Sequence, residues 1–247
     1  MNVIVFEYTA RFGHFLRAEA GVSGITYPIP PRTALLGLVG AVLGMEKDEP
    51  QTLLAQASIA VGGPSPKRFW HRVNVRKDPP NPLSLVFKLT VGRGTKEGKS
   101  KETKSEKNCR LSQEWLWQPR YRVWVVLPSP YQCDFADRLI NRRWYYSPCM
   151  GLSELTADLR LVGRFEGTPL AAGIHVVHSV ARREVVSIDV GEACRLRMAI
   201  QNLRMPRSVS PGRVFEHAGY LMERDGRPMP VSTEKAWRVG EEAVIFL

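Results

Sequence analysis

The chain has 247 residues, 44% of them hydrophobic, so it is long enough to bury one large core or two small ones. Its 35 Lys and Arg residues against 24 Asp and Glu residues give a formal net charge of +11. A folded protein this basic usually has a polyanionic partner, and nucleic acid is the first candidate. No apolar run is long enough to cross a bilayer, and the chain opens on a strand pattern rather than a signal peptide, so we expect a cytoplasmic protein.

Motifs for metals and cofactors are missing from the sequence. The four cysteines form no Cys-x-x-Cys pair, and His175 and His178 should point to opposite faces of a strand. There is no Walker loop, dinucleotide fingerprint or His-Glu-x-x-His motif. We therefore expect no metal, no cofactor and no catalytic site. A metal-free ribonuclease would need a base, an acid and a cation, and His14, His71 or Tyr27 beside a lysine or arginine leaves that alternative open.

The first predicted element is a strand over residues 3–8, apolar on both faces and hence central in a sheet. It leads into a segment in which Arg11, His14 and Arg17 alternate with two phenylalanines. Such alternation can bind phosphates while the rings stack on bases. It is equally typical of a strand end that packs its aromatic face inward, and the sequence does not separate the two readings.

Residues 24–44 combine a rigid elbow with a helix. Pro28, Pro30 and Pro31 keep the first part extended, and Pro31 suits the first helical turn. The apolar run that follows predicts a buried helix ending at Gly44, and two glycines three residues apart, Gly37 and Gly40, predict a strip where another backbone comes close.

The middle of the chain predicts a long hairpin. A helix is expected over 48–57 and a strand over 58–63, followed by a proline-rich basic segment over 64–81. Strand patterns over 83–91 and 120–127 flank a segment, 92–108, that has no apolar side chain and an excess of lysine. We interpret residues of about 83–127 as a hairpin with a basic tip that settles on phosphates; a solvated loop tip is the alternative.

A helix over 135–144 closes the first half. Its strand-helix-strand, strand-helix-strand order predicts an α+β, ferredoxin-like (RNA-recognition-like) domain over 1–147, with the long hairpin inserted as a thumb. Residues 148–247 read as a smaller β-rich part, with strands expected over 158–163, 173–178, 183–190, 195–200, from 214 onward, and over 243–247.

Three stretches carry a family resemblance. The Phe-Gly-His-Phe-Leu-Arg run over 12–17, the Tyr-Pro-x-Pro-Pro-x-Thr-x-x-x-Gly run over 27–37 and the Pro-x-x-Gly-x-Ser run over 148–153 resemble the CRISPR-associated Cas family five, a branch of the repeat-associated mysterious protein (RAMP) superfamily. The resemblance is firm over about the first 60 residues. It implies an RNA-recognition-like ferredoxin fold with a hairpin thumb and a variable β-rich C-terminal part.

The resemblance also implies a function. It is that of a subunit of a type I Cascade complex in antiviral defence, which holds the 5′ handle of the crRNA and caps the base of the backbone filament. The implied partners are the backbone subunit (Cas family seven) and the large subunit (Cas family eight or ten-like); contact with target DNA near the PAM stays open. Arg17 and the elbow over 27–33 would lie against the handle, with Arg32, Thr33 and the helix N-terminus donating to phosphate.

One branch of this family is itself a nuclease that uses a tyrosine, a lysine and a histidine, the last two adjacent. This chain has no Lys-His pair, and residues 42–44 contain no tyrosine. The resemblance therefore favours a non-catalytic subunit, with a metal-independent endoribonuclease that processes the repeat transcript as the alternative. The candidate RNA-binding residues are Arg11, His14, Arg17, Tyr27, Arg32, Thr33, Arg68, Trp70, Arg72, Lys88, Arg93, Lys96, Lys99, Lys101, Lys104 and Arg120.

Overall fold

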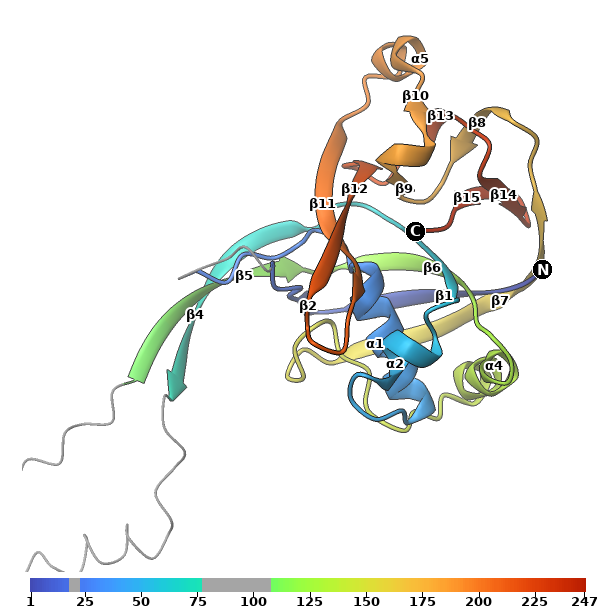
Figure 1. Ribbon diagram of the computed structural model, residues 1–247. Helices are drawn as coiled ribbons and strands as arrows, with labels where there is room; N and C mark the ends of the chain where they lie inside the picture. The colour runs from blue at the N-terminus through green and yellow to red at the C-terminus, as the bar shows by residue number, and fades with distance from the viewer. Residues whose placement is uncertain (18–22, 77–107) are drawn as a thin grey trace, which may run out of the picture.

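The computed structural model describes residues 1–17, 23–76 and 108–247. It is an α+β structure dominated by sheet, with few helices (Figure 1). The predicted strand over 83–91 and the lysine-rich segment up to residue 107 lie outside the described residues. Among the described residues, no helix is long and apolar enough to cross a membrane, and no three potential metal ligands gather.

Strand β1 (Asn2–Ala10) is the centre of the fold. It pairs antiparallel with β6 (Arg120–Val126) on one side and with β7 (Ala157–Pro169) on the other, and β6 pairs with β3 (Ser58–Gly62). Ile4 and Phe6 enter the main core, whereas Val3 and Val5 enter a second cluster on the opposite face around Trp124. The prediction of a strand buried on both faces is confirmed, since all four side chains are at most 1% exposed.

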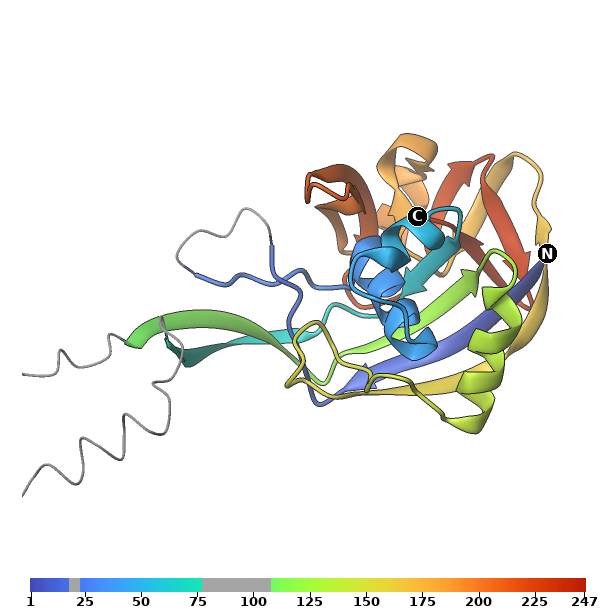
Figure 2. The same cartoon turned by 60° about the horizontal axis from the view of Figure 1, so that its bottom comes forward.

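Helices α1 (Arg32–Leu43), α2 (Glu49–Leu53) and α4 (Tyr131–Asn141) cover one face of these strands (Figure 2). As predicted, α1 begins after Pro31 and ends at Gly44, which has a left-handed φ of 83°. A Cβ on Gly40 would lie 2.1 Å from Pro50, so α2 can pack on α1 only at a glycine, whereas Gly37 faces open space. The close approach predicted from the glycine spacing is thus made by one of the two glycines.

The sheet continues beyond β7 into the C-terminal half. Its order is β10-β13-β8-β15-β14-β7-β1-β6-β3. The added strands are β14 (Ala236–Val239), β15 (Glu242–Ile245), β8 (Gly173–Val177), β13 (Met229–Thr233) and β10 (Ser187–Ile188). The division at residue 148 stays a prediction, but β7 follows that position and pairs with β1 along nine residues.

A second sheet, of β11 (Ile200–Val209), β12 (Phe215–Glu223) and β9 (Ala181–Arg182), packs its apolar face into the core that contains α1. The strands predicted over 183–190 and 195–200 are largely wrong. The chain forms a 3-10 turn η1 (Arg183–Val185) and a short helix α5 (Val190–Arg195) there, and only β10 and the first residue of β11 are strand within these ranges. Asp189 caps α5 by accepting a hydrogen bond from the Glu192 amide at 3.1 Å. This Asp-x-x-Glu capping signal was present in the sequence but was outweighed by the alternating apolar pattern.

A two-stranded ribbon of β4 (Lys67–Arg76) and β5 (Asn108–Trp117) projects from the body, with β2 (Phe12–Gly13) paired at its base (Figure 1). This corrects the predicted pairing. Residues 120–127 belong to the central sheet as β6 and do not form the return strand of the hairpin; the proline-rich segment instead supplies β4. Of the prolines that suggested a loop, Pro64 and Pro66 lie just before β4, where a missing N–H breaks no ladder bond.

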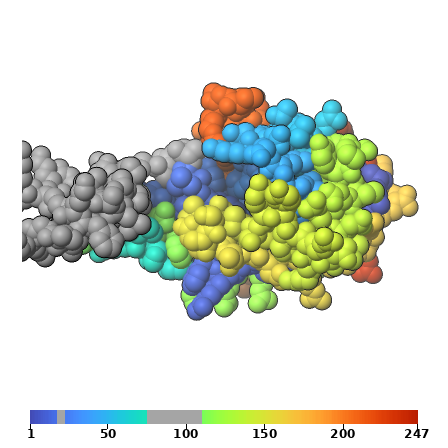
Figure 3. Space-filling model, turned by 90° about the horizontal axis from the view of Figure 1, so that it is seen from below, coloured from blue at the N-terminus to red at the C-terminus, as the bar shows by residue number. Residues whose placement is uncertain are grey.

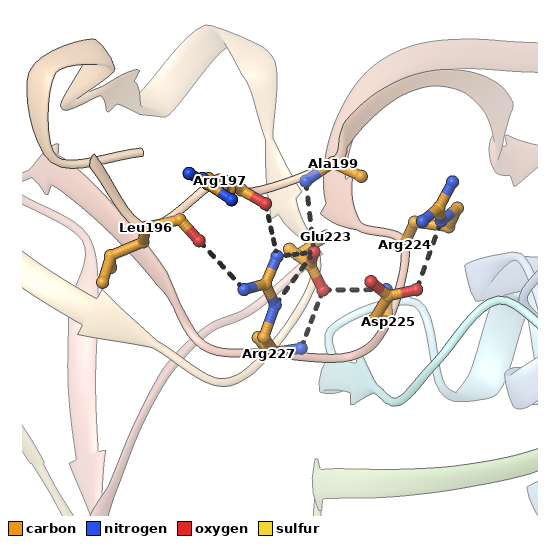
Figure 4. Close-up of polar contacts among 7 residues, drawn as sticks. All are labelled: Leu196, Arg197, Ala199, Glu223, Arg224, Asp225 and Arg227. Carbon is orange, nitrogen blue, oxygen red and sulfur yellow. Dashed lines mark hydrogen bonds and ion pairs between the residues drawn. The ribbon is translucent and has the colours of Figure 1, made fainter. Parts of the chain in front are cut away.

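A buried carboxylate fixes the loops at one end of the second sheet (Figure 4). Glu223 is 3% exposed and accepts hydrogen bonds from the amides of Ala199, Asp225 and Arg227 and from the Arg227 guanidinium at 2.9 Å. The same guanidinium donates to the carbonyls of Leu196 and Arg197. Burial raises the pKa of Glu223, but the hydrogen bonds from Arg227 and the three amides lower it more, so the pKa ends below its ordinary value.

We predict that Glu223→Gln destabilises the protein at pH 7 by about 1–3 kcal/mol, because the amide cannot accept all these donors. Since the folded pKa is lowered, the carboxylate's contribution is fully present above the ordinary value of 4.5 and is lost as the pH falls through the folded pKa. Urea unfolding at pH 7 and pH 3.5 measures both effects. The wild type should lose more stability than Glu223→Gln on acidification, while Glu241→Gln, at an exposed position, should match the wild type at both pH values.

Candidate nucleic-acid interface

One face of the β4–β5 ribbon carries three exposed arginines and an indole. Arg68, Trp70 and Arg72 alternate along β4 and therefore share a face, and their cross-strand neighbours include Glu114 and Ser112 on β5. Trp70 is 58% exposed. Arg68 Nη1 lies 3.5 Å from the carboxylate of Glu114. This basic face, which we define by Arg68, Trp70, Arg72 and Arg110, offers charges for phosphates and a ring for stacking on a base.

The opposite face of the ribbon is an aromatic cluster. Phe12 on β2 contacts Phe69, Trp115 and Trp117 with ring centroids 5.4–5.7 Å apart. His71 lies against Trp115 at 4.3 Å. Such edge and tilted ring pairs add to ordinary apolar burial. The cluster therefore holds the ribbon's base on β2, and it accounts for one of the two phenylalanines interleaved with the N-terminal basic residues.

Two predicted RNA-binding residues of the elbow region are buried instead. His14 is 1% exposed, and its Nδ1 lies 2.8 Å from the carbonyl oxygen of Glu114. Tyr27 is also 1% exposed and lies beneath the guanidinium of Arg17, which is 5.3 Å from the ring centroid. Because neither ring can reach a ligand from these positions, their assignment as direct RNA contacts is corrected: both hold the elbow in place.

Arg32 is likewise a structural residue. It is 9% exposed, and its Nη2 donates to the carbonyls of Ala55 at 2.7 Å and Ala57 at 3.0 Å. Burial, with the nearby charge of Arg207, lowers the pKa of the Arg32 guanidinium. The expectation that this side chain donates to RNA phosphate is therefore corrected, since its donors tie the start of α1 to the loop after α2.

Thr33 lines a groove of about 520 Å³ at the N-terminus of α1. The tip of the β11–β12 hairpin, including Arg213, closes one side of the groove, and Figure 3 shows this hairpin (orange) against the α1–α2 region (blue). Arg213 pairs with Asp48 at 2.9 Å across the mouth. The walls are largely apolar, with Leu16 60% and Phe215 41% exposed.

All three stretches that carry the family resemblance meet beside this groove. The amide of His14 donates to the carbonyl of Met150 at 3.0 Å. A Cβ on Gly151, whose φ is +92°, would lie 1.8 Å from the carbonyl oxygen of His14. The 148–153 motif therefore needs its glycine so that its loop can lie directly against the segment over 12–17.

Arg11 and Arg120 lie elsewhere. Together with Trp117, Gln118 and Arg160 they line a shallow cleft of about 860 Å³ that includes Asp158 and Glu7. This cleft is on the face of the central sheet opposite α1, because it is lined by Glu7 and Thr9, which alternate with the core residues Phe6 and Tyr8. The predicted residues are thus divided between separate surfaces, and the acidic groups make this one less favourable for an anion.

Six predicted residues fall outside the described part of the chain: Lys88, Arg93, Lys96, Lys99, Lys101 and Lys104. The sequence reading missed Arg110, which is opposite Asn74 on the ribbon, and Arg213 at the groove mouth. The alternation of polar and apolar residues over Asn108–Trp117 could have revealed the first. Nothing local to Arg213 marked it, because its position depends on the packing of a hairpin on α2.

Comparison with known proteins places this geometry in a family. A family model described as "CRISPR-associated protein (Cas_Cas5)" matches residues 3–204. A crystal structure of a CRISPR protein from Archaeoglobus fulgidus is similar over 100% of this chain and 99% of that one, with 15% identity and a TM-score of 0.54. A chain of a CRISPR RNA-guided surveillance complex is similar over 92% of this chain and 91% of that one, with 15% identity and a TM-score of 0.51.

At these identities the structural likeness shows a shared fold. No curated protein sequence matches significantly. The family model, in contrast, spans well over half of the chain and includes both β1 and the ribbon. The chain therefore belongs to the CRISPR-associated Cas5 family.

Proposed function

We propose that this protein is a non-catalytic, cytoplasmic subunit of a type I CRISPR Cascade complex that holds the 5′ handle of the crRNA and caps the base of the backbone filament. Its partners are then the handle RNA, the backbone subunit and the large subunit. Family membership supports the CRISPR role. The basic face of the ribbon is the observation that carries RNA binding, because it combines charge with an exposed ring on a rigid support.

The fold fits this proposal. The core strands run in the spatial order β7-β1-β6-β3, all antiparallel, with α1 after β1 and α4 after β6. That order supports the ferredoxin-like assignment made from the sequence. In this arrangement the ribbon is inserted between β3 and β6, so the core fixes the base of the ribbon while the basic face extends outward as a thumb (Figure 1).

Replacing two arginines of the ribbon tests the electrostatic contribution of the basic face to RNA binding. The double variant Arg68→Gln/Arg72→Gln should bind a handle RNA more weakly, with a salt slope of log Kd smaller by about 1.4, because two phosphate contacts on a single strand are lost. Titration across a series of salt concentrations measures this. The control Lys235→Gln/Arg238→Gln removes two exposed charges away from the ribbon and should keep the wild-type slope. A wild-type slope in the ribbon variant would remove the basic face from the interface.

Trp70 tests the stacking part. Trp70→Ala should weaken handle binding by about 1–3 kcal/mol, the range measured for a base stacked on an aromatic ring, with the salt slope unchanged. Trp70→Phe keeps a ring and should recover part of the loss. Because Trp70 is 58% exposed, neither change should alter thermal stability much. Equal affinity for the alanine and phenylalanine variants would exclude stacking at this position.

The proposal of a non-catalytic role is supported by the positions of the candidate acid–base residues. His14 and Tyr27 are buried and engaged, and His71 is on the ribbon face opposite Arg68. No two of these three can flank one phosphate. The purified protein should leave labelled repeat RNA uncut with or without EDTA over hours, as judged on a denaturing gel. Specific cleavage that persists in EDTA would establish the endoribonuclease alternative.

A further inference from the structure

A buried pair of unsatisfied donors lies where the second sheet faces α1. Tyr220 on β12 is 1% exposed, and its hydroxyl has no hydrogen-bond partner among residues 1–17, 23–76 and 108–247. Arg182 on β9 stands directly opposite Tyr220, so the two side chains share a face, and Arg182 Nε is also buried without a hydrogen-bond partner. Buried polar groups in native proteins are nearly always satisfied by protein, water or an ion. These two neighbouring donors therefore require an acceptor that the described part of the chain does not supply.

Two further arginines add positive charge to this region. The Nη1 of Arg32 lies 3.5 Å from the backbone oxygen of Arg207. The β11–β12 register shifts between Pro206 and Ser208, and a shift of this kind re-aims the side chain of the extra residue, Arg207. Arg207 is exposed, so it borders solvent while Arg32 lies inside. Arg32 is also the first residue of α1, whose positive dipole end lies at the same place.

The local charges favour an anion as the missing acceptor. Burial raises the pKa of Tyr220, and although Arg207, Arg182 and Arg32 act to lower it, the pKa remains above its ordinary value. The phenol is therefore a neutral donor at physiological pH. Arg182 stands opposite Tyr220, and Arg32 lies 3.5 Å from the carbonyl of Arg207, so three guanidiniums belong to this region. Glu184, which raises the pKa of Tyr220, is exposed. A water could satisfy the donors, but it would leave this excess of positive charge in place.

We propose that Tyr220, Arg182 and Arg207 form a phosphate-binding pocket, with Arg32 as the fixed positive charge behind it. Guanidinium groups match the geometry of phosphate oxygens, and a phenol adds one short hydrogen bond. The phosphate enters from the side of Arg207, because that side chain is exposed to solvent. The pocket is separate from the basic face of the ribbon, so this inference does not depend on the proposed handle binding.

Thermal unfolding in inorganic phosphate tests the pocket. At equal pH and ionic strength, the wild type should melt about 3–6 °C higher in phosphate, at about tenfold excess over Kd, than in chloride. Tyr220→Phe and Arg207→Gln should lose this difference. Arg204→Gln, which removes an exposed arginine on the same strand facing the other way, should keep it. Equal melting in both salts, or an undiminished shift in Tyr220→Phe, would overturn the pocket and leave ordered water as the acceptor.

The two variants should remain folded, so that a lost phosphate effect can be attributed to the pocket. In chloride, Tyr220→Phe should melt at or above the wild-type temperature, because a hydroxyl without a partner contributes no bond to lose. Arg207→Gln changes an exposed side chain and should fold normally. If Tyr220→Phe nevertheless unfolds, Arg207→Gln decides alone: a retained phosphate shift in that variant contradicts the proposal.

A short RNA identifies the source of the phosphate. A five-nucleotide RNA without terminal phosphates should raise the melting temperature of the wild type more than that of Tyr220→Phe if the pocket takes a backbone phosphodiester. Equal shifts in the two proteins, with the inorganic phosphate effect intact, assign the pocket to free or terminal phosphate. Arg68 and Arg72 are unchanged in these proteins, so failure of the pocket leaves ribbon binding standing, and failure of the ribbon variants leaves the pocket standing.

Discussion

The attachment of the elbow to the ribbon is the contact on which the arrangement of this molecule depends, and Glu114 makes it three ways. Its carboxylate accepts from the Thr26 amide at 3.1 Å, its amide donates to the Gly24 carbonyl at 2.7 Å, and its carbonyl lies 2.8 Å from His14 Nδ1. One residue of β5 thereby contacts the chain at His14 and again at Gly24 and Thr26, before it enters α1. Since α1 packs on the central sheet, the direction of the ribbon is coupled to the core.

The rigidity of α1 follows from a second set of contacts. Prolines at the elbow remove conformational freedom, and the Tyr121 hydroxyl donates to the Pro28 carbonyl at 2.7 Å within the core. Arg32 then joins the start of the helix to the loop after α2. A buried guanidinium is costly unless its donors are satisfied, so it is found where position matters more than net stability. The motif over 27–37 therefore produces a fixed turn of the backbone, and the Arg32 side chain within it stabilises that turn.

How much could be predicted from sequence depended on whether the signal was local. The strand at β1, the helix at α1 and its stop at Gly44 all followed from periodicity and from residues with strong backbone preferences. The predicted partner strand of the ribbon was wrong because packing decides which strands pair when they are far apart in sequence. Here the aromatic cluster around Phe12 favours the pairing of β4 with β5. For the elbow, the prediction of RNA contacts was based on residue type alone. Residue type does not tell an arginine exposed to solvent from one such as Arg32, whose guanidinium donates to backbone carbonyls inside the protein. The alternation of residues along β4 predicted the candidate interface better, because it shows which side chains lie on the same face of the strand.

The two cationic regions would act differently on a nucleic acid. Exposed arginines on the ribbon release counterions and attract any phosphate backbone, so they supply affinity that salt weakens and that carries little sequence information. A buried cluster such as that of Tyr220 and Arg182 is shielded from salt and admits only a group of the right size and charge. Arg32, the first residue of α1, lies 3.5 Å from the carbonyl of Arg207, and the elbow before it is hydrogen-bonded to Glu114 of the ribbon, so both regions are attached to the same corner of the backbone. An RNA strand bound both at the ribbon and at the Tyr220 cluster would be fixed in its register as well as held. Charges on a flexible surface could hold the strand but could not fix its register.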